Sequence, residues 1–600
     1  MSAPPIMPAV EHSPPTLDSL VGDAASPEAI SRLTRASRPP LRSNPKRAGK
    51  SATQASSLAM LRSALKAIGD GDYAEGTRLT LKALEKDEKN GLAWHILAVA
   101  QEKTGNLAEA FSAYEAAVRL LDDDTSVAFD LGRLAHRLGY LEIAEKLLSR
   151  FLSRNPGNVE ASNNLACALR DQNRSDEAID VLRNLIAVCP EEAVLWNSLG
   201  TVLSERGDAA QSVPFYDEAL RLDAGFYKAR YNRANVRMQL GEPALALADI
   251  DTALVGVKDA NEVATMTMAK ALTQFMVGDL RNGFDSYEAR FDPALQDAVT
   301  FQPHGRRWTL EDDIEGRAVL IYGEQGLGDE VLFANVLDDV QAAIGPKGRM
   351  ILAVQARLVP LFQRSYPSAD VVKHQTGLHL GRLFRAVELP TATPEVDLWT
   401  PIGSLFRRFR TSADSFPDKR AFLTPDPERV AHWHRMLSGL GPGLKVGVLW
   451  KSLNMKGARL RAYSPFDLWR PVLSVPGAHY VNLQYGDATA ELEAARAAGL
   501  EIWTPPGIDL KDDLDDLAAL CTALDIVMGP STATTNIAAA CGARVMMISN
   551  PDAWTGFGTD RAPCYPSLQA FHADGMGEWT GVMARLAEAL SGEVAREHVG

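Results

Sequence analysis

A fixed repeat length of 34 residues constrains the first half of this chain more than any other feature. Residues that tolerate a tight turn recur at this spacing, at Gly71, Gly105, Gly139, Asn173, Gly207 and Gly241. Glycine and asparagine adopt positive φ more readily than other residues, and a tight turn between two helices requires it. Apolar positions also recur between the turns. The pattern predicts pairs of antiparallel helices that stack into a solenoid.

This pattern resembles tetratricopeptide (TPR) repeats over about residues 57–297, with six regular units. A weaker seventh unit follows Gly278 after a three-residue slip, with Tyr287 at the position equivalent to Tyr216. Solenoids present a long concave surface that usually binds a protein partner. Four asparagines fall on the expected first helices of their repeats, where they either contact a partner's backbone or are ordinary solvated residues: Asn163, Asn164, Asn197 and Asn232.

Charge and composition exclude several functional classes. A net charge of −14 argues against nucleic acid as the main partner, because phosphate contacts need a basic surface. The basic, proline-containing stretch 31–50 belongs to residues 1–56, which we expect to form a disordered tail. No membrane span or signal peptide is recognisable, so we expect a cytoplasmic protein. The five cysteines lack the spacing of a zinc site.

The second half changes from continuous helices to short apolar runs that alternate with amphipathic helices. We expect strands at 318–322, 350–354 and 369–372, and then at 445–449, 479–483, 501–503, 525–528 and 544–548. Strands that alternate with helices predict parallel sheets joined by right-handed crossovers. The fold class expected is therefore an all-α TPR solenoid followed by an α/β region. After a linker over 298–316, this region is divided into two Rossmann-like lobes, 317–430 and 431–600.

Polar motifs follow several of the expected strands. They are the glycine-rich loop 323–329, the Val-Leu-Trp-Lys segment ending at Lys451, Arg461, the Asn-Leu-Gln segment ending at Gln484, and the Ser/Thr-rich turn 529–536. Ligands bind at the carboxyl ends of strands in such sheets, and here two such edges would face one cleft. The layout and motifs resemble GT-B glycosyltransferases over about residues 280–595, in particular TPR-linked members such as the bacterial flagellin O-glycosyltransferases.

The resemblance implies an inverting, metal-independent transfer of a sugar from a nucleotide donor to Ser or Thr of an acceptor protein. For a flagellin-type enzyme it implies flagellin docked on the concave face of the repeats, and a CMP-activated nonulosonic acid such as pseudaminic acid as donor. No other cofactor is implied. Related heptosyltransferases carry Asp-Thr and His in the last motif, whereas this chain has Ser531-Thr532 and Asn536. This difference argues against an ADP-heptose donor and leaves other nucleotide sugars open.

The turn between the strand at 525–528 and the next helix is the predicted phosphate site. A helix N-terminus offers free N–H groups and a partial positive charge, which suit a phosphate. The predicted donor-binding residues here are Ser531, Thr532, Thr534, Thr535 and Asn536. An ordinary helix cap needs only one of these hydroxyls.

Cationic residues follow the first strand of the second lobe, at Lys451, Lys456, Arg459 and Arg461. A leaving phosphate needs positive charge as the glycosidic bond breaks. Lys451 and Arg461 are therefore predicted to bind the donor, together with Gln484 of the matched motif. A solvated basic loop is the alternative.

Carboxylates crowd the glycine-rich loop of the first lobe. An inverting transfer needs a base within reach of the acceptor hydroxyl. We predict Asp329 as this base, with Glu324 as second candidate and Gly326 and Gly328 forming the acceptor loop; Asp329 as a helix cap is the alternative. The glycine order fits neither a Walker motif nor a dinucleotide fingerprint. The Asp-x-Asp pairs lie in repeats or at a helix start, so no metal site is expected.

The sequence therefore predicts a protein O-glycosyltransferase whose repeats select the acceptor and whose α/β half carries out the chemistry. Two other functions remain open. One is a non-catalytic scaffold or chaperone with a degenerate transferase-like half, and the other is a transferase of envelope glycans.

Overall fold

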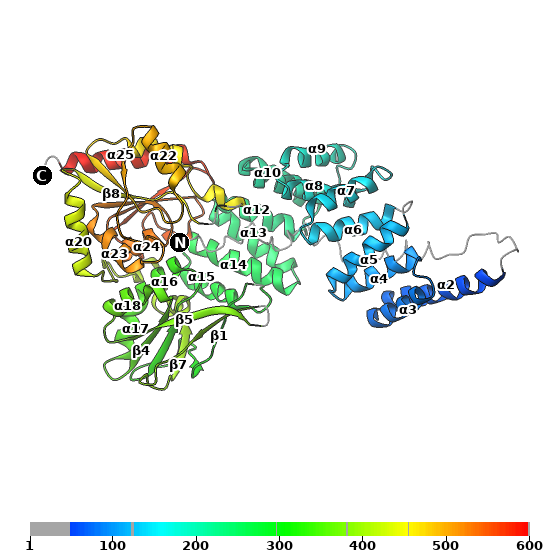
Figure 1. Ribbon diagram of the computed structural model, residues 1–600, viewed down its shortest axis with the longest axis horizontal. Helices are drawn as coiled ribbons and strands as arrows, with labels where there is room; N and C mark the ends of the chain where they lie inside the picture. The colour runs from blue at the N-terminus through cyan, green and yellow to red at the C-terminus, as the bar shows by residue number, and fades with distance from the viewer. Residues whose placement is uncertain are drawn as a thin grey trace. The chain divides into compact units, whose positions relative to one another are not determined.

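The computed structural model describes residues 48–121, 125–295, 297–379, 382–453, 455 and 457–597. Most of the predicted tail lies outside these residues. The chain forms two compact units, whose described parts are residues 48–229 and 230–597. Each unit is described below by itself, with the element labels of Figure 1.

The first unit consists of paired helices, as the repeat predicts. Their bounds are α2 (Ala48–Gly69), α3 (Tyr73–Lys86), α4 (Gly91–Lys103), α5 (Leu107–Leu120), α6 (Thr125–Arg137), α7 (Leu141–Leu152), α8 (Val159–Asp171), α9 (Ser175–Ile186), α10 (Ala193–Arg206), α11 (Ala209–Leu222) and α12 (Tyr227–Gln239), the last of which continues into the second unit. All the predicted turn residues have positive φ, from +61° at Asn173 to +114° at Gly207. A Cβ on Gly200 would lie 3.0 Å from the Tyr216 ring, so any larger residue would have to push this ring away. The predicted helical repeats are confirmed.

Two expectations for this unit need correction. Helix α2 begins at Ala48, before the predicted start of the repeats at residue 57, because the prolines that interrupt helices all precede it. The asparagines Asn163, Asn164 and Asn197 are buried rather than solvated, with exposed fractions of 2%, 6% and 0%. Asn232, by contrast, is half-buried.

The second unit begins with the last helices of the repeat array, α13 (Pro243–Gly256), α14 (Ala260–Met276), α15 (Leu280–Tyr287) and the 3₁₀ turn η2 (Glu288–Phe291). These helices share one hydrophobic core with the α/β lobes. The ring of Phe275 in α14 lies 5.3 Å from that of Trp554, in a loop of the second lobe. The compact α/β unit therefore starts near residue 230, not near residue 300, because the last helices bury their apolar side chains against the lobes.

The first sheet has the strand order β1-β6-β5-β4-β3-β7-β2. Its strands are β1 (Thr300–Phe301), β2 (Arg306–Arg307), β3 (Ala318–Tyr322), β4 (Arg349–Val354), β5 (Asp370–His379), β6 (Arg382–Val387) and β7 (Leu398–Pro401). All neighbours are parallel except β5 and β6, which form an antiparallel pair. The predicted linker 298–316 contributes β1 and β2 to the sheet. The sheet is thus mixed, where the sequence predicted parallel strands.

The second sheet has the order β10-β9-β8-β11-β12-β13, with every pair parallel. Its strands are β8 (Leu444–Val448), β9 (Ala478–Asn482), β10 (Ile502–Trp503), β11 (Ile526–Pro530), β12 (Val545–Ser549) and β13 (Leu568–His572). Numbered along the chain, this is the 3-2-1-4-5-6 order of nucleotide-binding α/β sheets. The α/β class of the second half is confirmed.

Helices cover both sheets. Those after β3, β4 and β7 are α16 (Leu327–Phe333), α17 (Leu337–Ile344), α18 (Val359–Ser365), α19 (Phe406–Phe409) and α20 (Pro427–Ser438). Those of the second sheet are α21 (Arg470–Leu473), α22 (Thr489–Ala497), α23 (Leu514–Ala523), α24 (Ala533–Ala540) and α25 (Trp579–Glu597). Helices α22 and α25 lie on one side of β8, and α23 and α24 on the other (Figure 1). Helix α16 packs against α24, so the two lobes meet along the helices that follow β3 and β11.

A buried ion pair joins the end of the repeats to the first sheet. Arg290 of η2 donates two hydrogen bonds to Glu324, one to each carboxylate oxygen and both 2.9 Å long. Its guanidinium also lies 4.2 Å from the centre of the Tyr287 ring and 4.0 Å from that of Phe291. Glu324 in turn accepts a 2.6 Å hydrogen bond from the backbone of Gly403, which follows β7.

We expect Arg290→Met to destabilise the α/β unit by about 3–5 kcal/mol, because Glu324 stays buried without its counter-charge. Denaturant unfolding monitored by tryptophan fluorescence measures this loss. The control is Arg306→Met, which breaks an exposed pair with Asp312 in the same lobe and should change the stability much less, because solvent screens exposed ion pairs. Equal losses in the two variants would contradict a special role for the buried pair.

Candidate functional site

The topology of the second sheet defines the candidate site. The chain leaves β8 towards β9 on one side and leaves β11 towards β12 on the other, while β8 and β11 are neighbours. In open α/β sheets a ligand-binding crevice lies outside the carboxyl ends of the two strands at such a point. The segments that follow these ends are the Lys451 segment and the Ser/Thr turn. The structure therefore brings these two predicted motifs to one sheet edge.

The Ser/Thr turn holds one uncommitted hydroxyl. Thr532 is the N-cap of α24 and only 2% exposed, and its Oγ1 has no hydrogen-bond partner among the described residues. Ser531 is half-buried beside it, and Thr534 is buried in the first turn of α24. A buried hydroxyl without a partner is costly unless a ligand or water satisfies it.

Two predicted donor-binding residues of this turn have structural roles. The hydroxyl of Thr535 accepts from the Thr532 N–H and donates to the Pro530 carbonyl, both over 2.9 Å. The amide of Asn536 donates to the Thr532 carbonyl over 2.7 Å and accepts from the Tyr565 hydroxyl over 2.7 Å. These bonds hold the turn in shape, and the prediction that both side chains bind the donor stays a prediction.

Gln484 also has a structural role. Its Oε1 accepts from the backbone N–H groups of Trp450 and Lys451, each over 2.9 Å, and its Nε2 donates to the Lys451 carbonyl over 3.1 Å. With an exposed fraction of 2%, this side chain joins the ends of β8 and β9. Gln484 thus fixes the Lys451 backbone, and its predicted contact with the donor stays a prediction.

The four predicted cationic residues lie in different surroundings or outside the described residues. Lys451 follows β8 as expected, but its ammonium group forms an ion pair with Glu491 of α22. Arg461 lies in the 3₁₀ turn η7 (Gly457–Ala462), where its carbonyl accepts from Asn550 over 3.5 Å. Lys456 and the side chain of Arg459 lie outside the described residues.

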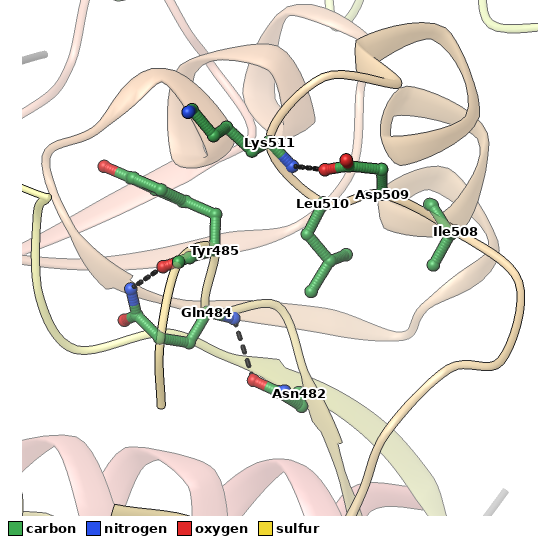
Figure 2. A pocket seen from close by; sticks show the side chains of 8 residues that line it. Asn482, Gln484, Tyr485, Ile508, Asp509, Leu510 and Lys511 are labelled. Atoms are coloured by element: carbon green, nitrogen blue, oxygen red, sulfur yellow. Dashed lines mark hydrogen bonds between the residues drawn. The ribbon is translucent and has the colours of Figure 1, made fainter. Parts of the chain in front are cut away.

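A pocket of about 340 Å³ opens beside this edge, after β9 and β10 (Figure 2). It is lined by Asn482, Gln484, Tyr485, Gly486, Ile508, Asp509, Leu510 and Lys511. In Figure 2 the side chains of Tyr485 and Lys511 extend to the same side of the pocket. An aromatic ring, two aliphatic side chains and an ammonium group suit a flat, polar heterocycle on a charged ligand.

The glycine-rich loop of the first lobe is held by buried charges. Gln325 has φ +58°, and Arg385 donates to the Gly323 carbonyl. Glu330 pairs with His374 over 2.8 Å and accepts from the Gln355 backbone over 2.8 Å. The predicted base Glu324 is fully engaged by Arg290 and Gly403 and only 1% exposed, so the prediction of a catalytic role for it is corrected.

Asp329 is buried at the start of α16. Its Oδ2 accepts a 3.0 Å hydrogen bond from the Gly326 N–H, while Gly328 is buried in the same turn. Burial raises the pKa of Asp329 to about 6, and the neighbouring carboxylates Glu324 and Glu330 act in the same direction. The geometry is that of a helix cap, the alternative that the sequence left open, with a carboxyl that gains a proton near pH 6.

The packing of α16 against α24 brings the two lobes' loops near each other. Tyr565, which binds Asn536 of the Ser/Thr turn, is buried, and this burial is the main cause of its raised pKa. Asp329 is among the charges that raise it further, so Asp329 and the Ser/Thr turn lie in one region. The sequence did not single out Tyr565, because a lone aromatic residue has no motif.

Within the described residues, no three His, Cys, Asp or Glu side chains gather as metal ligands. Nor does any described helix combine the length and apolar character needed to cross a bilayer.

We expect Asp329→Asn to stabilise the protein above pH 6. The pKa of Asp329 is 3.8 in the unfolded chain and about 6 in the folded protein. Below pH 3.8 the carboxyl is protonated in both states and its burial carries no charge penalty. As the pH rises through 6 the carboxyl must ionise while buried, and the folded state is destabilised relative to the unfolded chain. Asparagine still accepts from Gly326 and carries no charge, so the gain approaches about 3 kcal/mol at pH 8 and vanishes near pH 4. Denaturation at several pH values measures it.

The exposed Asp487 is the control, because the backbone N–H of Thr489 lowers its pKa. Asp487→Asn should therefore show no gain at high pH. An Asp329→Asn variant with the pH profile of the wild-type protein would mean that the Asp329 carboxyl is not buried as described.

Comparison with known proteins places the chain in a family. The tetratricopeptide repeat family model matches residues 61–125, 129–193 and 197–262. The BBSome complex member bbs-4 of Caenorhabditis elegans is 27% identical over 131 residues, which is 22% of this chain and 28% of that protein. A solved tetratricopeptide repeat protein from Parabacteroides merdae is 18% identical with a TM-score of 0.35, covering 39% of this chain and 93% of that one. Protein FlbA of Caulobacter vibrioides is 48% identical over 578 residues, covering 96% of this chain and 95% of FlbA. The chain therefore belongs to the family of Protein FlbA.

Proposed function

We propose that this protein is an O-glycosyltransferase that transfers a sugar from a nucleotide donor to Ser or Thr residues of an acceptor protein. The observation that carries the proposal is the strand order of the second sheet, which brings the Lys451 segment and the Ser/Thr turn together at the carboxyl ends of β8 and β11. There the N-terminus of α24 and the uncommitted hydroxyl of Thr532 point to an anionic ligand.

The donor phosphate would lie on the first turn of α24. Free N–H groups at a helix N-terminus and the Thr532 hydroxyl supply hydrogen bonds to phosphate oxygens. Lys451 follows the neighbouring strand and Arg461 lies in the turn that Asn550 holds at the end of β12. Their positive charges would stabilise the leaving phosphate.

The nucleoside of the donor would occupy the pocket after β9 and β10. Its volume of about 340 Å³ lies at the small end of the range for small-molecule sites, roughly 300–1,000 Å³, which suits one nucleoside. Tyr485 offers a ring for stacking, and Lys511 offers a cation. The sugar itself would then project from the phosphate towards the first lobe and the last repeat helices.

The acceptor would be a protein bound by the TPR repeats, since solenoids of this kind present long surfaces for protein partners. The resemblance to TPR-linked flagellin transferases makes flagellin the acceptor to test first, with a CMP-activated nonulosonic acid as donor. Membership of the FlbA family is compatible with this proposal.

The direct experiment mixes the purified protein with flagellin and a series of nucleotide sugars, and follows the intact mass of flagellin. We expect a mass increase of one or more sugar units, which persists in EDTA because lysine and arginine side chains supply the positive charge. A scaffold would bind flagellin without altering its mass and would not hydrolyse any donor. Transfer to a lipid-linked glycan but not to protein would identify an envelope transferase.

Thr532→Val tests the donor site. Valine keeps the branched shape, and Thr532 Oγ1 makes no internal hydrogen bond, so the melting temperature should stay nearly unchanged. A lost hydrogen bond to a charged phosphate is worth about 1.5–3 kcal/mol, or roughly 10- to 150-fold in donor affinity measured by calorimetry. The control is Thr535→Val, which removes internal hydrogen bonds and should lower the melting temperature. Unchanged donor affinity in Thr532→Val would move the phosphate away from this turn.

A further inference from the structure

The loop after β12, residues 550–558, begins at the same sheet edge as the Ser/Thr turn. Strands β11 and β12 are neighbours, with Pro530 paired to Ile548, and neighbouring strands lie about 5 Å apart. Asn550 fixes the start of the loop, because its side chain accepts from the Gly577 N–H over 3.1 Å. It also donates to the Arg461 carbonyl over 3.5 Å. The loop therefore starts beside the proposed donor phosphate.

The same loop ends against the last helices of the repeats. The rings of Trp554 and Phe557 lie 5.3 and 5.7 Å from that of Phe275 in α14. A Cβ on Gly241, in the turn before α13, would lie 3.6 Å from Pro551. Both ends of the loop are anchored, one at the donor edge and the other on α14.

Asp552 lies between these two anchors. It is half-buried, and among the described residues it has no ion pair and no hydrogen bond to another residue. Burial raises the pKa of its carboxyl to about 6, against a smaller lowering by a hydrogen bond from its own backbone N–H. A partly buried carboxyl without a partner is a candidate for chemistry, because an unpaired charge is costly to bury.

The carboxylates of the glycine-rich loop are committed elsewhere. Glu324 is paired with Arg290, and Glu330 with His374. Asp329 closes its own turn through the Gly326 N–H. None of these has the freedom of Asp552 to meet an incoming hydroxyl.

We propose that Asp552 is the general base that takes the proton from the acceptor hydroxyl. The inference rests on the glycosyl transfer proposed above. As the hydroxyl oxygen bonds to the anomeric carbon, its proton passes to the Asp552 carboxylate. The bond from that carbon to the phosphate oxygen breaks, and its electron pair stays with the nucleotide phosphate. The loop position suits this role, because the donor lies at one of its ends and the repeat helices lie at the other.

Asp552→Asn is the test, in the full-length protein with flagellin and the active nucleotide sugar. The substitution is near-isosteric, so we expect an unchanged melting temperature and unchanged affinity for the free nucleotide. Loss of a general base lowers the transfer rate roughly 10²- to 10⁴-fold. Asp560→Asn is the matched control, since Asp560 is exposed eight positions further along and should leave the rate unchanged. Asp329→Asn should also retain transfer.

Restoring activity with a small added carboxylate distinguishes a general base from a residue that only supports the structure. Asp552→Ala removes the carboxylate and leaves space, so added formate should restore part of its transfer rate, whereas formate should not improve transfer by Thr532→Val, whose expected defect is weaker donor binding. Wild-type transfer rates in Asp552→Asn would overturn the inference and leave the proposed function standing. Loss of nucleotide affinity in Asp552→Asn, or failure of formate to rescue Asp552→Ala, would also overturn it. A wild-type protein that transfers no sugar would overturn both proposals.

Discussion

The buried pair of Arg290 and Glu324 is the interaction on which the arrangement of the second unit depends. Arg290 comes from the turn that ends the repeat helices, and Glu324 from the carboxyl end of β3. Glu324 also accepts a hydrogen bond from the backbone after β7. Strand β7 is the neighbour of β3, and the first sheet's connections change direction between these two strands. One carboxylate thus fixes the repeat end, β3 and β7 together. Removing either charge would leave the other buried without compensation.

This pair makes the two sheets functionally unequal. Each has a point where a crevice is expected between neighbouring strands, β3 and β7 in the first and β8 and β11 in the second. In the first sheet, protein side chains fill the position, because Glu324 lies there with its guanidinium partner. In the second, the hydroxyl of Thr532 has no partner among the described residues. Under the proposed function, the ligand would therefore bind at the second sheet.

The sequence predicted the repeats well, because each turn requires a residue that adopts positive φ, and these glycine and asparagine residues recur every 34 positions. It also located the strands that are buried on both faces, such as β3, β4 and β8. It missed β6, in which two arginines interrupt the apolar residues, and the short strand β7 that ends in Pro401. At the candidate site the sequence could not predict the hydrogen bonds within the loops. Nothing in the residue types distinguishes Thr532 from Thr535, and Asp552 follows a proline in what reads as an ordinary turn.

Under the proposed function, the ion pair of Lys451 and Glu491 would link donor binding to the pocket. Both side chains are about one-fifth to one-quarter exposed, and such pairs contribute little, about 1 kcal/mol or less. A phosphate held by the N-terminus of α24 would therefore compete successfully for Lys451. Glu491 lies on α22, which begins four residues after Tyr485 of the pocket. Release of Glu491 would free α22 at the end nearest the proposed nucleoside, so the phosphate and the nucleoside would act on the same short segment. Selectivity for the donor would then depend on both parts of the nucleotide together.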